Sequence, residues 1–82
     1  MANKNTSQAG NPEIYNRLPV LRADRKISRR DLADALGVHY QTIGYLERGE
    51  YLPSLPLALK IGAYFGVPVE SVFSLEPFDP IG

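Results

Sequence analysis

The sequence predicts an all-α fold, a compact bundle of five short helices. Three observations lead to this prediction. Apolar residues recur three and four positions apart from Tyr15 onward, glycine or proline separates the periodic segments, and no strand-type alternation of useful length interrupts them. The chain has 82 residues, enough for one small domain. It has no cysteine, which excludes a disulfide framework, a zinc finger and a thiol nucleophile.

Composition divides the chain into three parts. Residues 1–13 are expected to form a flexible N-terminal arm, because MANKNTSQAGNP holds almost nothing that can pack. Residues 14–74 carry the periodic pattern and form the predicted domain. Residues 75–82 form a tail with three apolar side chains, Leu75, Phe78 and Ile81. We expect this tail to pack on the bundle or on a dimer partner.

The first helix is expected to begin after Asn16 as N-cap and to run to about Lys26. Pro19 then falls in the first turn, where the missing N–H of proline leaves no hydrogen bond unmade. Leu18 and Leu21, three residues apart, mark its buried edge.

The second helix is predicted to begin at Ser28, because Asp31 stands three residues further on and completes a variant of the capping box. Gly37 is the expected left-handed stop. The face between them that should be buried carries Leu32, Ala33 and Leu36.

The third helix is expected from Tyr40 to about Arg48, ended by Gly49. Its inner edge carries Ile43 and Leu46, and its outer side carries Tyr40, Gln41, Gly44 and Tyr45. Only residues 37–39 separate it from the second helix. Two short helices joined by a three-residue turn with glycine are typical of a helix-turn-helix.

The fourth helix is predicted between a cap at Ser54 and a stop at Gly66. Its apolar positions, spaced three and four apart, are Leu55, Ala58, Leu59, Gly62 and Phe65. A last short helix is expected at about Val69 to Phe73. No run approaches the roughly 18 apolar residues of a membrane span, and the polar start lacks a signal-peptide pattern, so we expect a cytoplasmic protein.

Four groups of residues follow one another in a characteristic order between Asn16 and Phe73. They are Ser28 with Asp31-Leu32-Ala33 and Leu36-Gly37-Val38; Gln41-Thr42-Ile43; Glu47-Arg48-Gly49; and Pro53-Ser54-Leu55 with Ala58-Leu59 and Phe65-Gly66-Val67. Together they resemble the helix-turn-helix domain of the Xre family, the lambda-repressor and Cro type of DNA-binding domain. The resemblance implies a five-helix bundle whose third helix enters the major groove of double-stranded DNA. It also implies binding as a dimer on palindromic operators.

The resemblance assigns DNA-binding roles to the third helix. Gln41 matches the family's glutamine, whose amide can pair with adenine or bond a phosphate. Tyr40 and Tyr45 stand where relatives often carry polar base-reading residues, although an exposed tyrosine pair is also compatible with ordinary surface or a protein-binding patch. Gly44 between them suits a close approach of the backbone to DNA or is merely tolerated. His39 replaces the usual serine cap and can meet a phosphate when protonated.

Further contacts are expected from the flanks of that helix. Arg29 stands where the family commonly has a glutamine for a phosphate contact, and Arg30 beside it suits either a phosphate or a solvated face. Thr42 can bond a phosphate or its own helix. Arg48 can contact a phosphate, or else pair with Glu47 or an opposing helix. Glu47 matches a position that usually packs within the domain.

The charges are balanced in number but not in place. Nine basic and nine acidic residues give zero net charge, whereas DNA-binding domains are usually basic. The stretch from Arg17 to Arg30, however, contains six basic residues and one acidic residue. The stretch from Tyr51 to Gly82 contains one basic and three acidic residues. A local positive face can steer DNA even when the total is neutral. We therefore expect modest non-specific affinity for DNA. Discrimination between DNA sequences should come mainly from the third helix and from dimerisation.

These patterns predict a sequence-specific DNA-binding transcriptional regulator, a dimeric repressor without cofactor or small-molecule ligand. An enzyme is not expected, since no carboxylate pair, Ser/His/Asp arrangement or phosphate-cradling glycine loop can be assembled. His39 without cysteines nearby is not a metal site. The alternative is a protein-interaction module on the same scaffold, such as an antitoxin-like partner binder, which the tyrosines and the apolar tail would serve.

Overall fold

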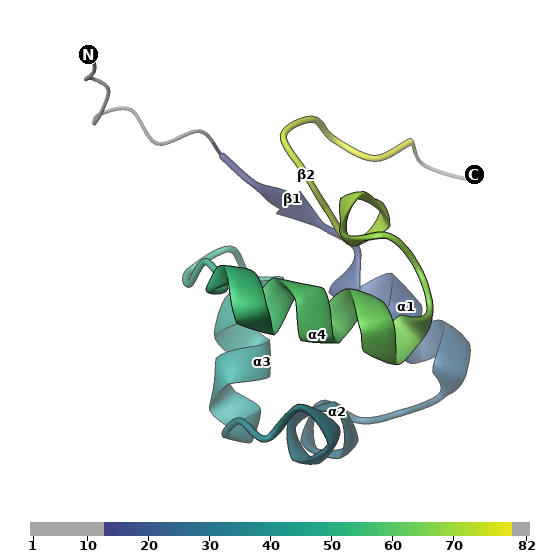
Figure 1. Cartoon of the computed structure of the whole chain (residues 1–82), viewed down its shortest axis with the longest axis vertical. Helices are drawn as coiled ribbons and strands as arrows, with labels where there is room; N and C mark the ends of the chain where they lie inside the picture. The colour runs from purple at the N-terminus through teal and green to yellow at the C-terminus, as the bar shows by residue number, and fades with distance from the viewer. Residues whose placement is uncertain (1–12, 80–82) are drawn as a thin grey trace.

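The computed structural model describes residues 13–79, which form four α-helices and a small strand pair (Figure 1). In chain order the elements are β1 (Tyr15–Asn16), α1 (Leu18–Arg25), α2 (Arg29–Leu36), α3 (Tyr40–Glu47), α4 (Leu55–Phe65), the 3₁₀ turn η1 (Val69–Ser71) and β2 (Phe73–Ser74). The arm expected over residues 1–13 lies outside the described residues except for Glu13, and so does Ile81 of the tail. No helix of the described part is long and apolar enough to span a membrane.

The predicted caps of α2 and α4 are confirmed. The Ser28 hydroxyl accepts from the Asp31 N–H at 2.9 Å, and the Ser28 N–H donates to the Asp31 carboxylate at 3.0 Å, which completes the capping box. The Ser54 hydroxyl accepts from the N–H of Leu57 at 3.2 Å. Both helices end on a glycine with positive φ, 76° at Gly37 and 71° at Gly66.

The start of α1 differs by one residue from the prediction. The helix begins at Leu18 after Arg17, although the Asn16 side chain still accepts from the Leu18 N–H at 3.0 Å. Its end falls at Lys26 as expected, where the backbone turns left-handed at φ 58° without a glycine.

The core gathers apolar side chains from every α-helix and from Val72, which follows η1. The fully buried large residues are Leu18, Leu32, Ile43, Leu46, Ile61 and Val72. The predicted inner edges of α2 and α3 are therefore confirmed. The predicted face of α4 is wrong in part, because Leu55 is 69% and Leu59 54% exposed while Leu57 and Ile61 point inward. Since α4 is apolar on nearly all sides, spacings of three and four residues fit more than one face.

The fifth helix is absent from the described residues. Only the 3₁₀ turn η1 forms, and the chain then extends as β2, which pairs antiparallel with β1 in the register Asn16 to Phe73 (Figure 1). The Arg17 N–H donates to the Val72 carbonyl at 2.9 Å and continues this pairing toward α1. The C-terminal segment thus gains its hydrogen bonds from the start of the domain rather than from a helix of its own.

Candidate nucleic-acid interface

α3 packs directly on α2, and its first turn is capped by a histidine ring. The Nδ1 atom of His39 accepts from the Gln41 N–H at 3.2 Å, so the imidazole serves as the N-cap of α3, the role that serine usually has in the family. The backbone carbonyl of His39 accepts from the Thr42 N–H at 2.9 Å. The turn from Gly37 to His39 therefore sets the direction in which α3 leaves α2.

A stack of side chains ties the outer face of α2 to the first turn of α3. The rings of His39 and Tyr40 lie 5.0 Å apart between centroids with an interplanar angle of 27°. The guanidinium carbon of Arg30 lies 4.6 Å from the centroid of the Tyr40 ring, within the range of a cation–π contact. These contacts hold the exposed Tyr40 ring against its neighbours.

Six of the nine residues proposed from the sequence line a single shallow hollow of about 210 Å³. They are Arg29, Tyr40, Gln41, Gly44, Tyr45 and Arg48. Of the other three, Arg30 and His39 adjoin the hollow through their contacts with Tyr40. Thr42 is half-buried and does not line it. The fold thus brings helix positions from both α2 and α3 onto one surface.

Gly44 leaves room for two guanidinium groups over the hollow. A Cβ atom at this residue would lie 3.1 Å from Nη1 of Arg48 and 3.5 Å from Nη1 of Arg29. Arg48 also lies over the Tyr45 ring, with its guanidinium carbon 5.3 Å from the centroid. The glycine therefore has a role within the domain that the sequence did not indicate. The two interpretations from the sequence were a close approach of the backbone to DNA and mere tolerance of the glycine. In the structure, the glycine lets two cations from different elements approach the same point.

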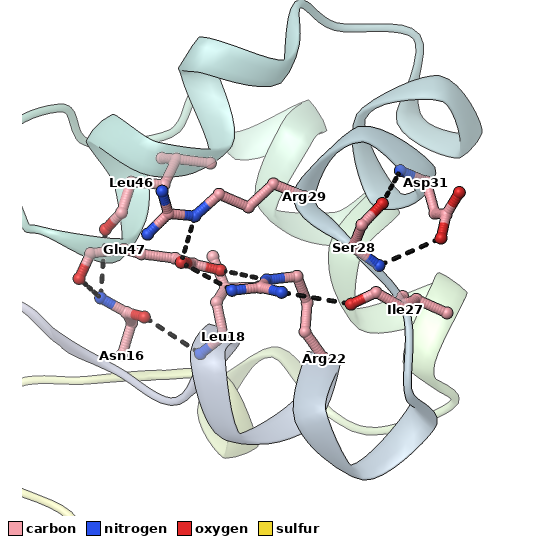
Figure 2. Close-up of polar contacts among 9 residues, drawn as sticks. All are labelled: Asn16, Leu18, Arg22, Ile27, Ser28, Arg29, Asp31, Leu46 and Glu47. Carbon is pink, nitrogen blue, oxygen red and sulfur yellow. Dashed lines mark hydrogen bonds and ion pairs between the residues drawn. The ribbon is translucent and has the colours of Figure 1, made fainter.

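A buried carboxylate stands behind this surface. The Glu47 side chain is only 2% exposed and bonds two arginines (Figure 2). Nε of Arg22 donates to Oε2 at 2.6 Å, and Nε of Arg29 donates to Oε1 at 2.9 Å. The hydrogen bond to Glu47 raises the pKa of Arg22 above its ordinary value, against the opposing effect of burial. Glu47 thus packs within the domain as expected, and it positions Arg29.

Arg22 was not singled out in the sequence, although its spacing carried a signal. It follows the buried Leu18 by four residues and so shares the inner face of α1. Besides Glu47 it reaches the Ile27 carbonyl at 3.1 Å (Figure 2). A long cation on a buried helix face calls for a buried acceptor, and Glu47 supplies it.

Asn16 contributes more than the helix cap expected of it. Its amide nitrogen donates to the Leu46 carbonyl at 3.1 Å and the Glu47 carbonyl at 3.3 Å, while its oxygen holds the Leu18 N–H (Figure 2). One side chain therefore closes the end of α3 and the start of α1.

The basic run between Arg17 and Arg30 does not face outward as a whole. Arg22 forms an ion pair with Glu47 inside the domain. Nη2 of Arg25 donates to the Phe65 carbonyl, at the end of α4, at 2.7 Å. Arg17 lies over the Phe78 ring, 5.1 Å from its centroid. The positive face is consequently smaller than the count along the chain suggested. It rests chiefly on the arginines around the hollow.

No group of three His, Cys, Asp or Glu side chains within the described range is arranged to hold a metal ion. The chemistry of this surface is that of guanidinium, amide, phenol and imidazole groups. Such groups donate hydrogen bonds to phosphate oxygens and to base edges.

Comparison with known proteins places this arrangement in a family. The model of the helix-turn-helix family matches residues 21–72. The chain belongs to this family, the lambda-repressor-like or Xre type. It is a family of DNA-binding transcription regulators and not one of enzymes.

Relatives share much of the sequence over almost their whole length. An uncharacterized HTH-type transcriptional regulator of Methanocaldococcus jannaschii is 48% identical over 63 residues, which is 77% of this chain and 96% of the relative. The regulator YgzD of Bacillus subtilis, described in the same terms, is 44% identical over the same share of both chains. A crystal structure of a candidate DNA-binding protein from Bacteroides fragilis has the same fold. It has a TM-score of 0.67 at 24% identity and covers 74% of this chain and 98% of that one.

Proposed function

We propose that the protein is a sequence-specific DNA-binding transcriptional regulator that places α3 in the major groove of double-stranded DNA. The observation that carries the proposal is the convergence of Arg29 and Arg48 over Gly44, in a hollow that Gln41 also lines. Guanidinium groups bind phosphates through charge-assisted hydrogen bonds, and here they flank a helix with polar groups on its outer side. Contacts of both kinds, to backbone and to bases, are what sequence-specific binding requires.

In this proposal the side chains of the hollow form two groups, one for phosphates and one for base edges. Arg29 and Arg48 serve as phosphate contacts at the edge of the groove, while Tyr40, Gln41 and Tyr45 face the base edges. α3 has eight residues and so a length of about 12 Å, which the major groove, also about 12 Å wide, admits. The Gln41 amide suits adenine, which offers one acceptor and one donor in this groove.

The protein acts in this proposal as a homodimer that represses by occupying a palindromic operator. A two-fold dimer on one face of the duplex places its reading helices about 34 Å apart, one helical turn. The neutral total charge supports such a mode of action. A single domain whose basic side chains are partly used internally gains little from non-specific binding and depends on two half-sites for affinity.

The proposal is tested by selecting bound sequences from a random DNA pool and then measuring two variants on the selected duplex. Gln41→Ala is expected to cost about 1–3 kcal/mol at one operator position and to relax the preference there. Arg29→Ala is expected to weaken binding to all sequences alike and to lower the salt slope by about one. Lys26→Asn, which removes an exposed cation outside the hollow and keeps the left-handed backbone acceptable, controls for loss of net charge.

Absence of binding by the unaltered protein to any duplex at about 50 mM salt would contradict the proposal. That result would favour a second candidate function, a protein-interaction module such as an antitoxin-like partner binder. One observation supports this candidate, namely the exposure of two leucines on α4, Leu55 and Leu59. Salt dependence separates the two functions, because an apolar protein contact weakens far less with added salt than a phosphate contact does.

A further inference from the structure

Arg29 and Arg48 come from different elements and meet above Gly44. Arg29 opens α2, and Arg48 is the C-cap residue of α3. A Cβ atom at Gly44 would lie 3.5 Å from Nη1 of Arg29 and 3.1 Å from Nη1 of Arg48, so both terminal nitrogens lie close to one point. Both side chains line the same hollow of about 210 Å³. The fold therefore brings two guanidinium groups to one small volume.

Each of these two guanidinium groups is anchored to a carboxylate through its Nε atom. Nε of Arg29 donates to Oε1 of Glu47 at 2.9 Å, and Nε of Arg48 forms an ion pair with Oε1 of Glu50 at 3.2 Å. Neither of these contacts engages an Nη atom. The Nη donors, which are the outer ends of the two groups, therefore stay available to a ligand in the hollow.

The two carboxylates do not balance the charge of the arginines that they bind. Glu47 is shared between Arg22 and Arg29, and Glu50 pairs with Arg48, so three guanidinium groups share two carboxylates. One positive charge is in excess within this cluster. Two like charges close to one volume repel each other, and an anion between them replaces that repulsion by attraction. A single anion in the hollow would therefore balance the cluster.

A phosphate group is the anion that suits this arrangement. Guanidinium groups bind phosphate oxygens through charge-assisted hydrogen bonds, and a tetrahedral phosphate offers oxygens to donors that come from more than one direction. Gln41 and the two tyrosines also line the hollow and carry further N–H and O–H donors. Among the described residues, no acid lines it. The hollow therefore combines excess positive charge with an abundance of donors.

We propose that the hollow above Gly44 is a clamp that binds one phosphate group with Arg29 and Arg48 at the same time. The inference rests on the proposed function and deepens it, because it makes the two arginines one phosphate site rather than two separate contacts along the DNA backbone. All the residues that line the hollow come from a single copy of the chain. The clamp should therefore also bind inorganic phosphate when no DNA is present.

The first test is a titration of the full chain with inorganic phosphate, with chloride at the same ionic strength as the reference. NMR follows the signals of the Gly44 amide and of the arginine Nε–H groups. Arg29→Ala and Arg48→Ala each remove one half of the clamp. Arg30→Ala is the matched control, because Arg30 adjoins the hollow through Tyr40 without lining it. Circular dichroism verifies that each variant keeps its helices.

We expect saturable binding with a Kd of about 1–10 mM for the unaltered chain and for Arg30→Ala, and binding at least about tenfold weaker for each of the other two variants. Absence of saturation in the unaltered chain up to about 50 mM phosphate would overturn the inference. Equal losses in all three variants would also overturn it, because they would show attraction by the general charge of this face. So would a loss in only one of the two clamp variants, since a clamp needs both arginines.

A second measurement distinguishes a DNA phosphate from a free phosphate group. On the duplex selected from the random pool, the backbone phosphates of one half-site are replaced one at a time by an uncharged methylphosphonate. If the clamp holds DNA, one linkage should account for the losses caused by both arginine variants, and the double variant should bind within about twofold of either single variant. Two separate linkages with additive losses would overturn the inference. Saturable phosphate binding without any duplex binding would support the clamp as a site for a free phosphate group and would contradict the proposed function alone.

Discussion

α2 and α3 are alike in size and different in what stabilises them. Each has eight residues, begins after a side chain that accepts a backbone N–H, and buries three of its residues. α2 starts with the reciprocal bonds of Ser28 and Asp31 and stops on Gly37. α3 starts with one bond to the His39 ring and contains Gly44, and it ends past Arg48 on the predicted Gly49, whose φ is also left-handed at 76°.

The difference indicates where each helix obtains its stability. The local sequence of α2 favours a helix on its own, because its cap is reciprocal and no glycine lies within the helix. α3 depends on contacts from elsewhere, chiefly those of Glu47 with two arginines and of Asn16 with its last carbonyls. Because its stability comes from the inner side, its outer side is free to carry residues that suit a binding surface.

The largest effect is expected from removing the inner support of α3. Glu47→Ala leaves Arg22 and Arg29 without their shared acceptor, and Arg22 is largely buried. Loss of one partner from a buried ion pair costs about 3 kcal/mol of the free energy of unfolding. Urea denaturation followed by circular dichroism measures this change.

The matched control is Glu50→Ala, which removes the other acid that pairs with an arginine of this surface. Both Glu50 and Arg48 are about half exposed, so the loss should stay below about 0.5 kcal/mol. Equal losses for the two variants would show that α3 is not held by its buried side.

A smaller loss of stability is expected from removing the N-cap side chain of either α2 or α3, and its size should differ between the two helices. Ser28→Ala should cost about 1 kcal/mol, whereas His39→Ala should cost less than about 0.5 kcal/mol, because an imidazole is the weaker cap. Thermal denaturation of the two variants checks the order. A loss at His39 larger than that at Ser28 would reverse the comparison and make the first turn of α3 locally stable.

Gly44→Ala should stabilise the protein by about 0.5–1 kcal/mol, since alanine favours the interior of a helix. The added Cβ meets only the flexible ends of Arg48 and Arg29. Their displacement should weaken duplex binding while the melting temperature rises. Gly62→Ala is the control in α4, where the Cβ would lie 2.9 Å from the backbone oxygen of Val67 and the fold must lose stability. A Gly44→Ala variant that binds the duplex unchanged would contradict the role given to the hollow.

The smallest effect concerns the pH dependence of stability and comes from Asp31 in α2. Hydrogen bonds from the Ser28 backbone and side chain hold the pKa of the Asp31 carboxyl below its usual value. A pKa lowered by folding contributes stability that is complete above the unfolded value, about 4, and is lost as the pH falls through the folded one. The difference in melting temperature between the unaltered chain and Asp31→Asn should therefore shrink as the pH is lowered from about 6 to about 3. In a Ser28→Ala background the same difference should be reduced and still present, because the backbone N–H of residue 28 continues to donate to the Asp31 carboxylate.

Local signals in the sequence predicted much of the fold. The caps at Ser28 and Ser54 and the stops at Gly37 and Gly66 follow from side-chain chemistry that acts within a few residues, and they are confirmed. The strand pair could not be predicted in this way. Two residues on each side show no alternation, and their pairing depends on where the fold brings Val72 and Arg17 together.

The candidate site, too, has features that local sequence predicted and features that depend on the tertiary fold. That Gln41 and Tyr45 lie outward follows from helical spacing, and the structure places them in the hollow. That Arg22 bonds Glu47 depends on the angle between α1 and α3, which no local pattern contains. The spacing of Leu18 and Arg22 indicated only that a cation would lie on the inner face of α1.

The shared carboxylate of Glu47 has a consequence for the entropy of complex formation. Since its two oxygens bond arginines of α1 and α2, the end of α3 loses its freedom of motion when the chain folds. Little of that freedom is left to lose when a partner docks on the outer side. The helix meets its partner preorganised, and more of the energy of each new contact remains as affinity.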